Sequence, residues 1–292
     1  IVMATALAAF IGTLCMALLA NYPFALAPGL GLNAYFAYTV CGTMGYDWRI
    51  ALMAVFAEGI IFIVLSLTNV REAIFNAIPM QLKKGVSVGI GLFVAFIGLQ
   101  NGHIVVNSDS TLVTVVNFTE NFHTVGIAAL LCVIGLIIKN VKGSFLIGIF
   151  ATWILGIICQ LTGIYTVDVD AGFYSLIPTQ WVSFDFSSLG ETFGQCFQAD
   201  MGRVNALDFV VIIFAFLFVD MFDTIGTLIG VANKADMLDE NGKLERIKPA
   251  LLADAIATSA GAILGTSTTT TFVESSSGVS EGARTGLASV VT

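Results

Sequence analysis

Three acidic residues lie in stretches of the chain that are otherwise uncharged. Asp220 and Asp223 lie near the middle of the apolar run at 208–232, and Glu274 separates a run of threonines from a run of serines. A charged side chain at the centre of a bilayer costs about 2.5–3.5 kcal/mol on an insertion scale, so acids in such positions indicate a function. We expect Asp223 and Glu274 to face one polar cavity, to accept hydrogen bonds from a small ligand, and one of them to exchange a proton.

The spacing around Asp223 predicts how a helix presents it. Asp220, Asp223 and Thr227 follow one another at i, i+3 and i+7, which places them on one helix face. Gly226 and Gly230 form a small-xxx-small pair, which lets another helix approach closely. In the alternative interpretation the acids are protonated or paired between helices and only hold the bundle together. That alternative weighs more for Asp220 than for Asp223.

Two further polar residues have no decided role from the sequence. Glu58 stands alone in the apolar run at 50–68, where a functional position, an ion pair and a gate position are all compatible with it. Asn33 lies on a small-residue segment, where structural capping and ligand contact are equally compatible. No metal or cofactor is expected, because both histidines fall in one polar loop and the five cysteines form no metal-binding cluster.

The composition places these residues in a membrane. Of the 292 residues, 57% are hydrophobic and only 11% are charged, whereas a soluble domain has about 25% charged residues. Such a chain is not a cytosolic enzyme, a nucleic-acid binder or a disordered protein, and its net charge of −8 also argues against nucleic acid. We therefore predict an all-α polytopic membrane protein in contact with the lipid bilayer.

Seven apolar runs approach the roughly 20 residues that a bilayer-spanning helix needs. They lie at about 1–20, 50–68, 85–100, 124–139, 143–163, 208–232 and 249–265. Two more segments, at about 22–42 and 266–292, are apolar only in part and are broken by Pro, Gly, Ser and Thr. We expect the chain to be a fragment of a longer protein, because it begins and ends inside apolar runs.

The basic residues predict the orientation of the spans. Cytoplasmic loops are rich in Lys and Arg, and the basic loops here are 69–84, with Arg71 and Lys83, 139–143 and 233–248. The loops at 101–123 and 164–207 are then outside. The second of these is long, acidic and aromatic, and we expect a solvated connector, with a lid as the other interpretation.

The two broken segments share one layout. In each, a full span is followed by a short breaker-rich stretch and a small-residue helix, and the charge count has the first entering from outside and the second from inside. This is an inverted-topology repeat, and interrupted spans in matching positions indicate a transporter's binding site. We predict that residues 1–205 hold the first repeat, without its first span, and the loop after it. Residues 206–292 begin the second repeat.

The breaks themselves predict local structure. Pro23 and Pro28 hold the first break extended, and the β-branched run at 266–271 favours a strand. Because extended backbone at membrane depth must find partners inside the protein, we predict that the two segments pair as a short antiparallel ribbon. Each then opens a half-helix, at about Leu30 and about Val279, whose free N–H groups face the break.

Three motifs resemble the adenine/guanine/hypoxanthine permease branch of the nucleobase–cation symporter (xanthine/uracil permease) family. They are NYPFALAPGLGLNAYF at 21–36, FVDMFDTIGT at 218–227 and TTTFVESSSG at 269–278. The resemblance covers the whole chain. It implies fourteen spans in two inverted repeats of seven, divided into a core and a gate, with a short strand and a half-helix in spans three and ten. The chain would then hold spans two to ten, a partial seven-plus-seven inverted-repeat transporter fold.

The resemblance also implies a function. It implies a secondary active transporter, not an enzyme, that imports purine nucleobases by proton symport, with sodium left open. It implies a multi-pass protein of the plasma (bacterial inner) membrane and a homodimer. The residues implied in substrate binding are Asp223, Glu274, Asn33, Thr227, Phe272 and, through its backbone, Phe24; those considered for proton coupling are Asp223, Glu274 and Asp220. The uracil and xanthine branches carry Glu at the position of Asp223, so Asp fits the purine branch.

Three other functions are weighed against this one. An anion carrier of the same inverted-repeat architecture would need a basic or neutral site at the breaks, where this chain has two acids. An intramembrane aspartyl hydrolase would need Asp on two facing spans and a Gly-x-Gly-Asp motif, which Gly29-Leu30-Gly31-Leu32 does not provide. A membrane scaffold that transports nothing would not need buried carboxylates.

Overall fold

Helices dominate the fold because backbone N–H and C=O groups inside a bilayer must be satisfied within the protein. The computed structural model describes residues 1–116, 125–139, 141–169, 173–178, 186–240 and 243–292. Within these ranges six helices are long and apolar enough to cross a membrane: Val2–Ala20, Trp48–Leu67, Met80–Asn101, Ser144–Leu161, Ala206–Lys234 and Ile247–Leu264. They confirm six of the seven predicted runs. The seventh, at 124–139, contains a shorter helix of 14 residues, α6 (Val125–Ile138).

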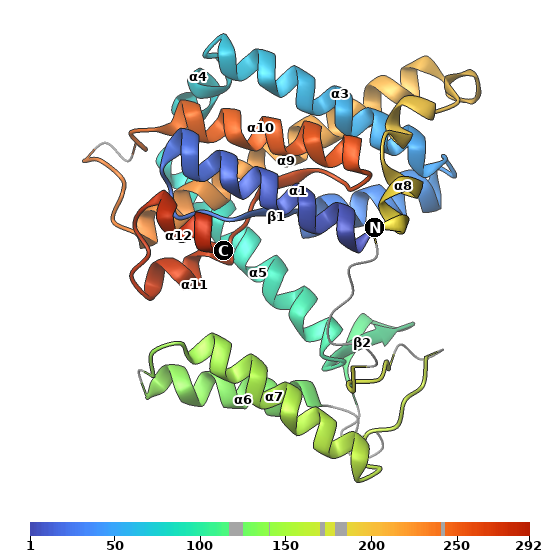
Figure 1. Cartoon of the computed structure of the whole chain (residues 1–292), viewed down its shortest axis with the longest axis vertical. Coiled ribbons are helices and arrows are strands. Elements are labelled where there is room, and N and C mark those ends of the chain that lie inside the picture. Colours follow the sequence, from blue (N-terminus) through green and yellow to red (C-terminus); the bar gives the residue numbers. More distant parts are fainter. Residues whose placement is uncertain (117–124, 140, 170–172, 179–185, 241–242) are drawn as a thin grey trace. The chain divides into compact units, whose positions relative to one another are not determined.

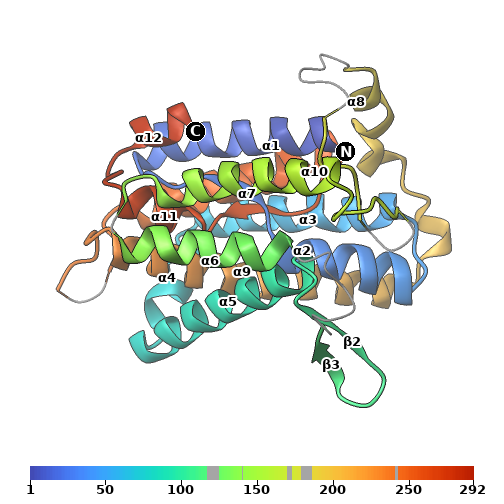
Figure 2. The same ribbon diagram turned by 90° about the horizontal axis from the view of Figure 1, so that it is seen from below.

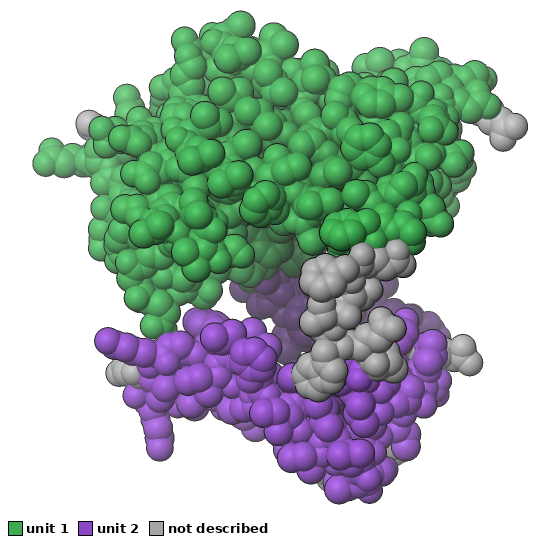
Figure 3. Space-filling model, in the orientation of Figure 1, with its two compact units in different colours: residues 1–91, 185–292 green, residues 92–184 purple. Residues whose placement is uncertain are grey.

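The chain forms two compact units, residues 1–91 with 185–292 (unit 1) and residues 92–184 (unit 2) (Figure 3). Unit 1 begins with α1 (Val2–Cys15), the π-helical segment η1 (Met16–Ala20), β1 (Leu26–Pro28), α2 (Leu30–Ala34), the π-helical segment η2 (Tyr35–Thr43), α3 (Trp48–Leu67), α4 (Val70–Ala77) and the first part of α5 (Met80–Asn101). It continues with α8 (Ser187–Thr192), the 3₁₀ turns η3 (Gln195–Gln198) and η4 (Met201–Arg203), α9 (Ala206–Lys234), α10 (Ile247–Leu264), β4 (Thr269–Thr271), α11 (Ser275–Ser280) and α12 (Gly286–Val291). The repeat boundary at 205/206 stays a prediction, because a sequence repeat need not be a compact unit.

Unit 2 holds a helix pair and a hairpin. Helices α6 and α7 (Ser144–Leu161) run side by side (Figure 2), in close contact where Gly148 faces Val133. Strands β2 (Val105–Ser108) and β3 (Leu112–Val115) pair antiparallel in the 101–123 loop. The sequence had predicted only a polar loop there.

The two broken segments meet as an antiparallel ribbon, as predicted. Strand β1 pairs with β4 in the register Leu26↔Thr271, Ala27↔Thr270 and Pro28↔Thr269. Helix α2 begins at Leu30, which confirms the predicted start of the first half-helix. The predicted start near Val279 was wrong: α11 begins at Ser275, because serines are favourable in a first helical turn, where their hydroxyls bond nearby backbone groups.

Threonines from neighbouring helices cover the two free edges of the ribbon. Thr13 on α1 accepts a hydrogen bond from the Leu26 amide at 2.9 Å and donates to the Leu26 carbonyl at 3.3 Å. Thr258 on α10 donates to the Thr269 carbonyl at 2.9 Å. An unpaired strand edge inside a bilayer would leave these groups unsatisfied, so the side chains replace a third and a fourth strand.

Helix α10 lies between α1 and α3 (Figure 1) and packs on both. Small residues permit this approach. A Cβ added to Gly12 on α1 would lie 2.7 Å from the Ala257 Cβ, and one added to Gly59 on α3 would lie 2.4 Å from the Ser259 Oγ and 2.8 Å from its amide nitrogen. Small residues at such contacts allow the backbones of membrane helices to come together.

A buried ion pair joins α4 to α10. Arg71 is 2% exposed, and its Nη2 lies 2.8 Å from the Asp254 Oδ2. Its Nη1 donates to the Leu251 carbonyl at 2.9 Å, and its guanidinium lies 3.8 Å from the centre of the Phe62 ring. The sequence had counted Arg71 as a cytoplasmic loop charge; the structure instead places it inside unit 1, because Asp254 provides the opposite charge.

Asp254 also holds the ribbon. Its Oδ1 accepts from the Thr271 amide and the Thr270 hydroxyl, each at 3.0 Å. Its Oδ2 accepts from Thr224 on α9 at 3.1 Å in addition to Arg71. Both oxygens of this fully buried carboxylate are therefore satisfied, and one side chain links α4, α9, α10 and β4.

We expect Gly59→Ala to lower the melting temperature of the purified protein in detergent. The new methyl group would meet the Ser259 backbone, and overpacking of this kind costs about 1–3 kcal/mol. Gly85→Ala on α5 is the control, since no heavy atom lies within 4 Å of that added Cβ; it should melt at or above wild type, because Ala favours a helix over Gly by up to about 1 kcal/mol. Equal melting of the two variants would contradict this packing.

We expect Asp254→Asn to destabilise the protein strongly, because it removes the closest countercharge of buried Arg71 and leaves only Asp220, at 3.7 Å. Breaking one partner of a buried pair costs about 3–5 kcal/mol. The double variant Arg71→Gln with Asp254→Asn should melt higher than Asp254→Asn alone, since the buried cation that has lost its closest partner is removed as well. Thermal unfolding of the two single variants and the double variant measures this coupling. If the stability losses of the two single variants add up to the loss of the double variant, the two residues act independently.

Candidate functional site

Asp223 projects from α9 to the point where the first half-helix begins. A Cβ added to Gly29, the residue before α2, would lie 3.4 Å from the Asp223 Oδ2. The backbone of Gly29 has φ −65° and ψ 132°, which any residue can adopt. Glycine suits this position by its small size, because an added Cβ would also lie 3.1 Å from the Thr270 Cγ2 and 3.2 Å from the Leu32 Cδ1.

Glu274 comes to the same region from the second broken segment. It directly precedes α11, and its side chain is exposed in unit 1. Helix α11 packs against α9, and Asp223 and Glu274 are close enough for their charges to interact. The structure thus brings together the two acids that the sequence analysis selected.

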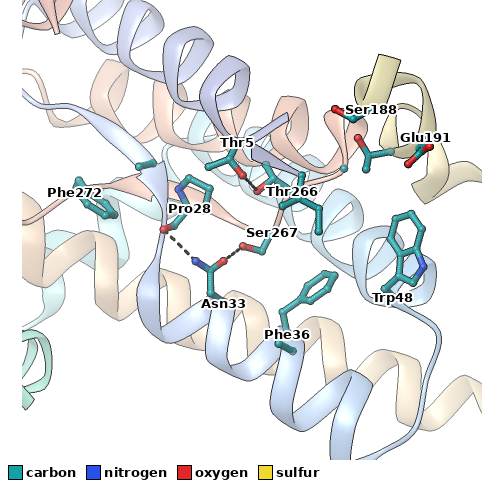
Figure 4. Close-up of a pocket in the computed structure, with 15 residues that line it drawn as sticks. Thr5, Pro28, Asn33, Phe36, Trp48, Ser188, Glu191, Thr266, Ser267 and Phe272 are labelled. Atoms are coloured by element: carbon teal, nitrogen blue, oxygen red, sulfur yellow. Dashed lines mark hydrogen bonds between the residues drawn. The ribbon is translucent and has the colours of Figure 1, made fainter. Parts of the chain in front are cut away.

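Asn33 lies beside the ribbon. Its Nδ2 is 3.5 Å from the Pro28 carbonyl oxygen, and its Oδ1 accepts a hydrogen bond from the Ser267 hydroxyl. The side chain therefore bridges the ends of the two broken segments (Figure 4). This arrangement accounts for a structural role, and Asn33 also lines a cavity.

The two aromatic residues have different surroundings. Phe24 is fully buried, with its ring stacked on Tyr22 at a centroid distance of 5.0 Å, and its carbonyl oxygen accepts from the Ser289 hydroxyl at 3.3 Å. Phe272 follows β4, and its amide donates to the Ala25 carbonyl at 2.9 Å. Phe272 is half-buried and lines the same cavity as Asn33.

The remaining residues of α9 contact other parts of unit 1. Thr227 is buried, one turn after Asp223. The predicted close approach at Gly226 is confirmed, because the Ser87 hydroxyl of α5 donates to the Gly226 carbonyl at 2.6 Å. Asp220 is fully buried, with its Oδ2 3.7 Å from the Arg71 Nη2. Asp220 therefore belongs to the group of charges around Arg71.

Asp254 and Arg71 were missed by the sequence analysis. Asp254 is an acid inside the apolar run at 249–265, which is the same signal that selected Asp223. Arg71 had no comparable signal, since it follows a span and looks like an ordinary loop residue. Its role depends on the fold, which turns α4 back against α10.

A cavity of about 760 Å³ lies next to the ribbon (Figure 4). Its lining comes from the start of the chain with α1, from β1, α2, η2, α3 and α8, and from the segments that flank β4: Ile1, Thr5, Ala27, Pro28, Asn33, Phe36, Ala37, Trp48, Ser188, Glu191, Thr192, Gly265, Thr266, Ser267 and Phe272. Asp223 and Glu274 are not among these residues. The cavity therefore includes residues of both breaks, whereas Asp223 on α9 and Glu274 before α11 lie outside its lining.

Part of the 164–207 loop takes part in this cavity. Helix α8 contributes Ser188 and Glu191 to its lining. The Thr192 hydroxyl donates to the Leu264 carbonyl at 2.9 Å, and the Gly194 amide donates to the Ile263 carbonyl at 2.7 Å. These bonds cap the carboxyl end of α10, so this part of the loop is not the solvated connector that the sequence predicted.

Comparison with known proteins identifies relatives along the whole chain. A protein of Methanocaldococcus jannaschii named "Putative permease MJ0326" is 48% identical over 292 residues, which are 100% of this chain and 63% of that protein. The guanine/hypoxanthine permease PbuG of Bacillus subtilis is 44% identical over 99% of this chain and 62% of its own length. The adenine permease AdeP of Escherichia coli is 38% identical over 98% of this chain and 60% of its own length. The chain thus spans less than two thirds of the length of these relatives.

A solved structure has a similar fold. The transmembrane domain of the cyanobacterial bicarbonate transporter BicA matches with a TM-score of 0.60 at 13% identity, over 99% of this chain and 75% of that chain. The likeness confirms the predicted fold class, an all-α polytopic membrane protein with an inverted-repeat transporter fold and two short strands in its broken spans.

The family follows from the sequence comparison. The family model Xan_ur_permease, described as "Permease family", matches residues 1–292. Together with the six apolar helices, the match shows a multi-pass membrane protein. Because the match covers every residue, the chain belongs to this permease family, as its xanthine/uracil permease motifs had predicted.

Proposed function

We propose that this chain forms the substrate-binding part of a secondary active transporter, not an enzyme, that imports purine nucleobases by proton symport. The observation that carries the proposal is the position of Asp223 and Glu274 beside a ribbon made from two interrupted spans. The functions named for two relatives, a guanine/hypoxanthine permease and an adenine permease, support it.

The chemistry of a purine suits this arrangement. Its ring N–H groups are donors, and carboxylates such as Asp223 and Glu274 are acceptors that make charge-assisted hydrogen bonds. Its carbonyl or ring nitrogens are acceptors for the free N–H groups at the start of a half-helix, such as the one that begins at Leu30. Phe272 provides an aromatic face, while Asn33 and Thr227 add polar groups nearby. Phe24 is proposed to contribute only its backbone, since its ring is buried in the core.

Guanine and hypoxanthine are the purines that we propose first. Both carry an N1–H donor next to the O6 acceptor, which matches a carboxylate that lies beside helix N–H groups. Adenine has an unprotonated N1 and an amino group at C6, so it reverses that pattern. The identities agree with this order, since the guanine/hypoxanthine permease is 44% identical and the adenine permease 38% identical.

The cavity beside the ribbon is proposed as the route to the site. Trp48 and helix α8 lie at the ends of segments that the charge pattern places outside the membrane, so this cavity would open to the exterior. Its volume of about 760 Å³ is within the range of small-molecule sites, about 300–1,000 Å³. Asn33 and Phe272 lie on its wall, and an incoming base would meet them after Trp48 and α8.

An anion carrier of the same architecture is less well supported. The likeness to a bicarbonate transporter domain concerns the fold. An anion at the breaks would meet Asp223 and Glu274, and two like charges repel it.

We expect Asp223→Asn and Glu274→Gln each to lower the uptake of radiolabelled hypoxanthine and guanine at least about tenfold. Each substitution removes a charged acceptor, and a hydrogen bond to a charged group contributes about 1.5–3 kcal/mol. Uptake is measured in cells that carry the full-length gene. Glu240→Gln, in an exposed loop, is the matched control and should transport as wild type does. If all three variants are indistinguishable from wild type, the proposed site is wrong.

We expect tight binding of the base to require its N1–H group. Guanine should compete with labelled hypoxanthine for uptake, whereas 1-methylhypoxanthine should compete at least about tenfold more weakly, because a buried acceptor without its donor costs about 1–3 kcal/mol. Adenine should also compete more weakly than guanine. Competition curves for guanine, 1-methylhypoxanthine and adenine against hypoxanthine uptake by the wild-type protein measure this. Equal potency of the three compounds would contradict the proposed contact with N1–H.

A further inference from the structure

Glu58 is a fully buried acid outside the proposed substrate site. It lies on α3, next to Gly59, where the close contact with Ser259 presses α3 against α10. Its side chain is 0% exposed. Its Oε2 accepts a hydrogen bond from the Thr268 hydroxyl at 2.9 Å, but its Oε1 has no hydrogen-bond partner among the described residues.

The charges around Glu58 do not balance. The ionisable groups whose charges reach it are Asp220 on α9, Asp254 on α10 and Arg71 on α4. Three carboxyl groups thus share one guanidinium in the described part of the chain. Asp254 is the nearer of the two aspartates to Arg71, with an N–O distance of 2.8 Å, and Asp220 lies at 3.7 Å.

Glu58 is therefore the carboxyl group without a cation. An isolated buried carboxylate is so unfavourable that the group takes up a proton instead. Arg71 lies 2.8 Å from Asp254 and 3.7 Å from Asp220, and Asp254 also accepts hydrogen bonds from Thr224, Thr270 and the Thr271 amide, whereas Glu58 forms no ion pair among the described residues. The bond that forms on protonation is an O–H bond on Glu58, and the proton is supplied by water on one side of the membrane.

We propose that Glu58 holds the coupled proton, in a site separate from the Asp223 and Glu274 pair that binds the base. This inference rests on the proposed function, and it assigns the proton to a residue that the substrate does not need to touch. Asp223 and Glu274 then act as hydrogen-bond acceptors for the purine, and Glu58 carries the charge-compensating proton.

The contacts of Glu58 show how its proton is linked to the substrate site. The Thr268 hydroxyl donates to Glu58, and the Thr268 carbonyl oxygen accepts a hydrogen bond from the Gly29 amide nitrogen at 3.1 Å. Gly29 is the residue beside which the Asp223 Oδ2 lies. Loss of the proton makes Glu58 a stronger acceptor for the Thr268 hydroxyl, and that change reaches the start of α2 through two hydrogen bonds.

The test separates binding from coupling. The purified full-length protein is placed in proteoliposomes, and labelled hypoxanthine is followed in two assays, exchange without a pH gradient and accumulation driven by an imposed pH gradient. For one proton per base, wild type should accumulate roughly tenfold per pH unit. Glu58→Gln should keep exchange within about twofold of wild type but lose accumulation, while the exposed control Glu240→Gln keeps both.

Accumulation by Glu58→Gln that equals wild type would overturn the inference and leave the proposed function standing. Wild-type accumulation driven by a sodium gradient in the absence of a pH gradient would overturn both the inference and the proposed proton symport, and would leave purine transport standing. If wild type exchanges no purine at all, the proposed function fails, and the protonation of Glu58 is decided by spectroscopy alone.

Infrared spectroscopy provides that independent measurement. At neutral pH, wild type should show the C=O stretch of a buried carboxylic acid, which Glu58→Gln lacks and Glu240→Gln keeps. If Glu58→Gln does not fold, Thr268→Val should shift the same band, since it removes the hydrogen bond to Oε2. A band that persists in Glu58→Gln, or that does not move in Thr268→Val, overturns the inference.

Discussion

The structure depends on satisfying extended backbone where no water is available. A span that is interrupted inside a bilayer exposes N–H and C=O groups, and each one left unpaired costs several kcal/mol. The two breaks pair with each other from Leu26 to Pro28 and from Thr269 to Thr271, and Thr13 and Thr258 close the edges. The close contacts among α1, α3 and α10 follow from this, because the helices must come near enough for their side chains to reach the ribbon.

The acids of unit 1 fall into two groups with different surroundings. Asp254 and Asp220 share the charge of Arg71, and Glu58 is buried close to them. Asp223 and Glu274 lie by the half-helices, where the described residues provide no cation contact. The first group is suited to hold structure and a proton, and the second to meet a polar molecule.

The sequence was sufficient for the features that follow from local rules. Apolar length predicted the spans, and the prolines and threonines of the breaks predicted a ribbon and the start of α2 at Leu30. The selection of Asp223 and Glu274 as binding residues came from treating both breaks as one site, and it stays a prediction. The three motifs were enough to indicate the family, because they lie at the breaks and around the acids of α9.

The sequence was insufficient where a residue's role depends on tertiary contacts. Arg71 looks like a surface charge until α4 turns back and places it against Asp254. The serines after Glu274 looked like part of the break, yet they enter α11, because a helix can begin with serine hydroxyls bonded to its own backbone. The part of the 164–207 loop that caps α10 depends on Thr192 and Gly194 reaching its last carbonyls.

The π-helical segments give the two breaks unequal mechanical properties. Segments η1 and η2 lie on the two sides of β1, and a π-helix winds more residues into each turn than an α-helix does. Rewinding either segment as an α-helix would lengthen it along its axis without breaking the chain. The described helices next to β4 are α-helices and cannot lengthen in this way. Thr268, Thr270 and Thr271 also donate hydrogen bonds to the buried carboxyl groups of Glu58 and Asp254. The first crossing is thus extensible and the second is anchored, so any displacement between them is taken up on the side of β1.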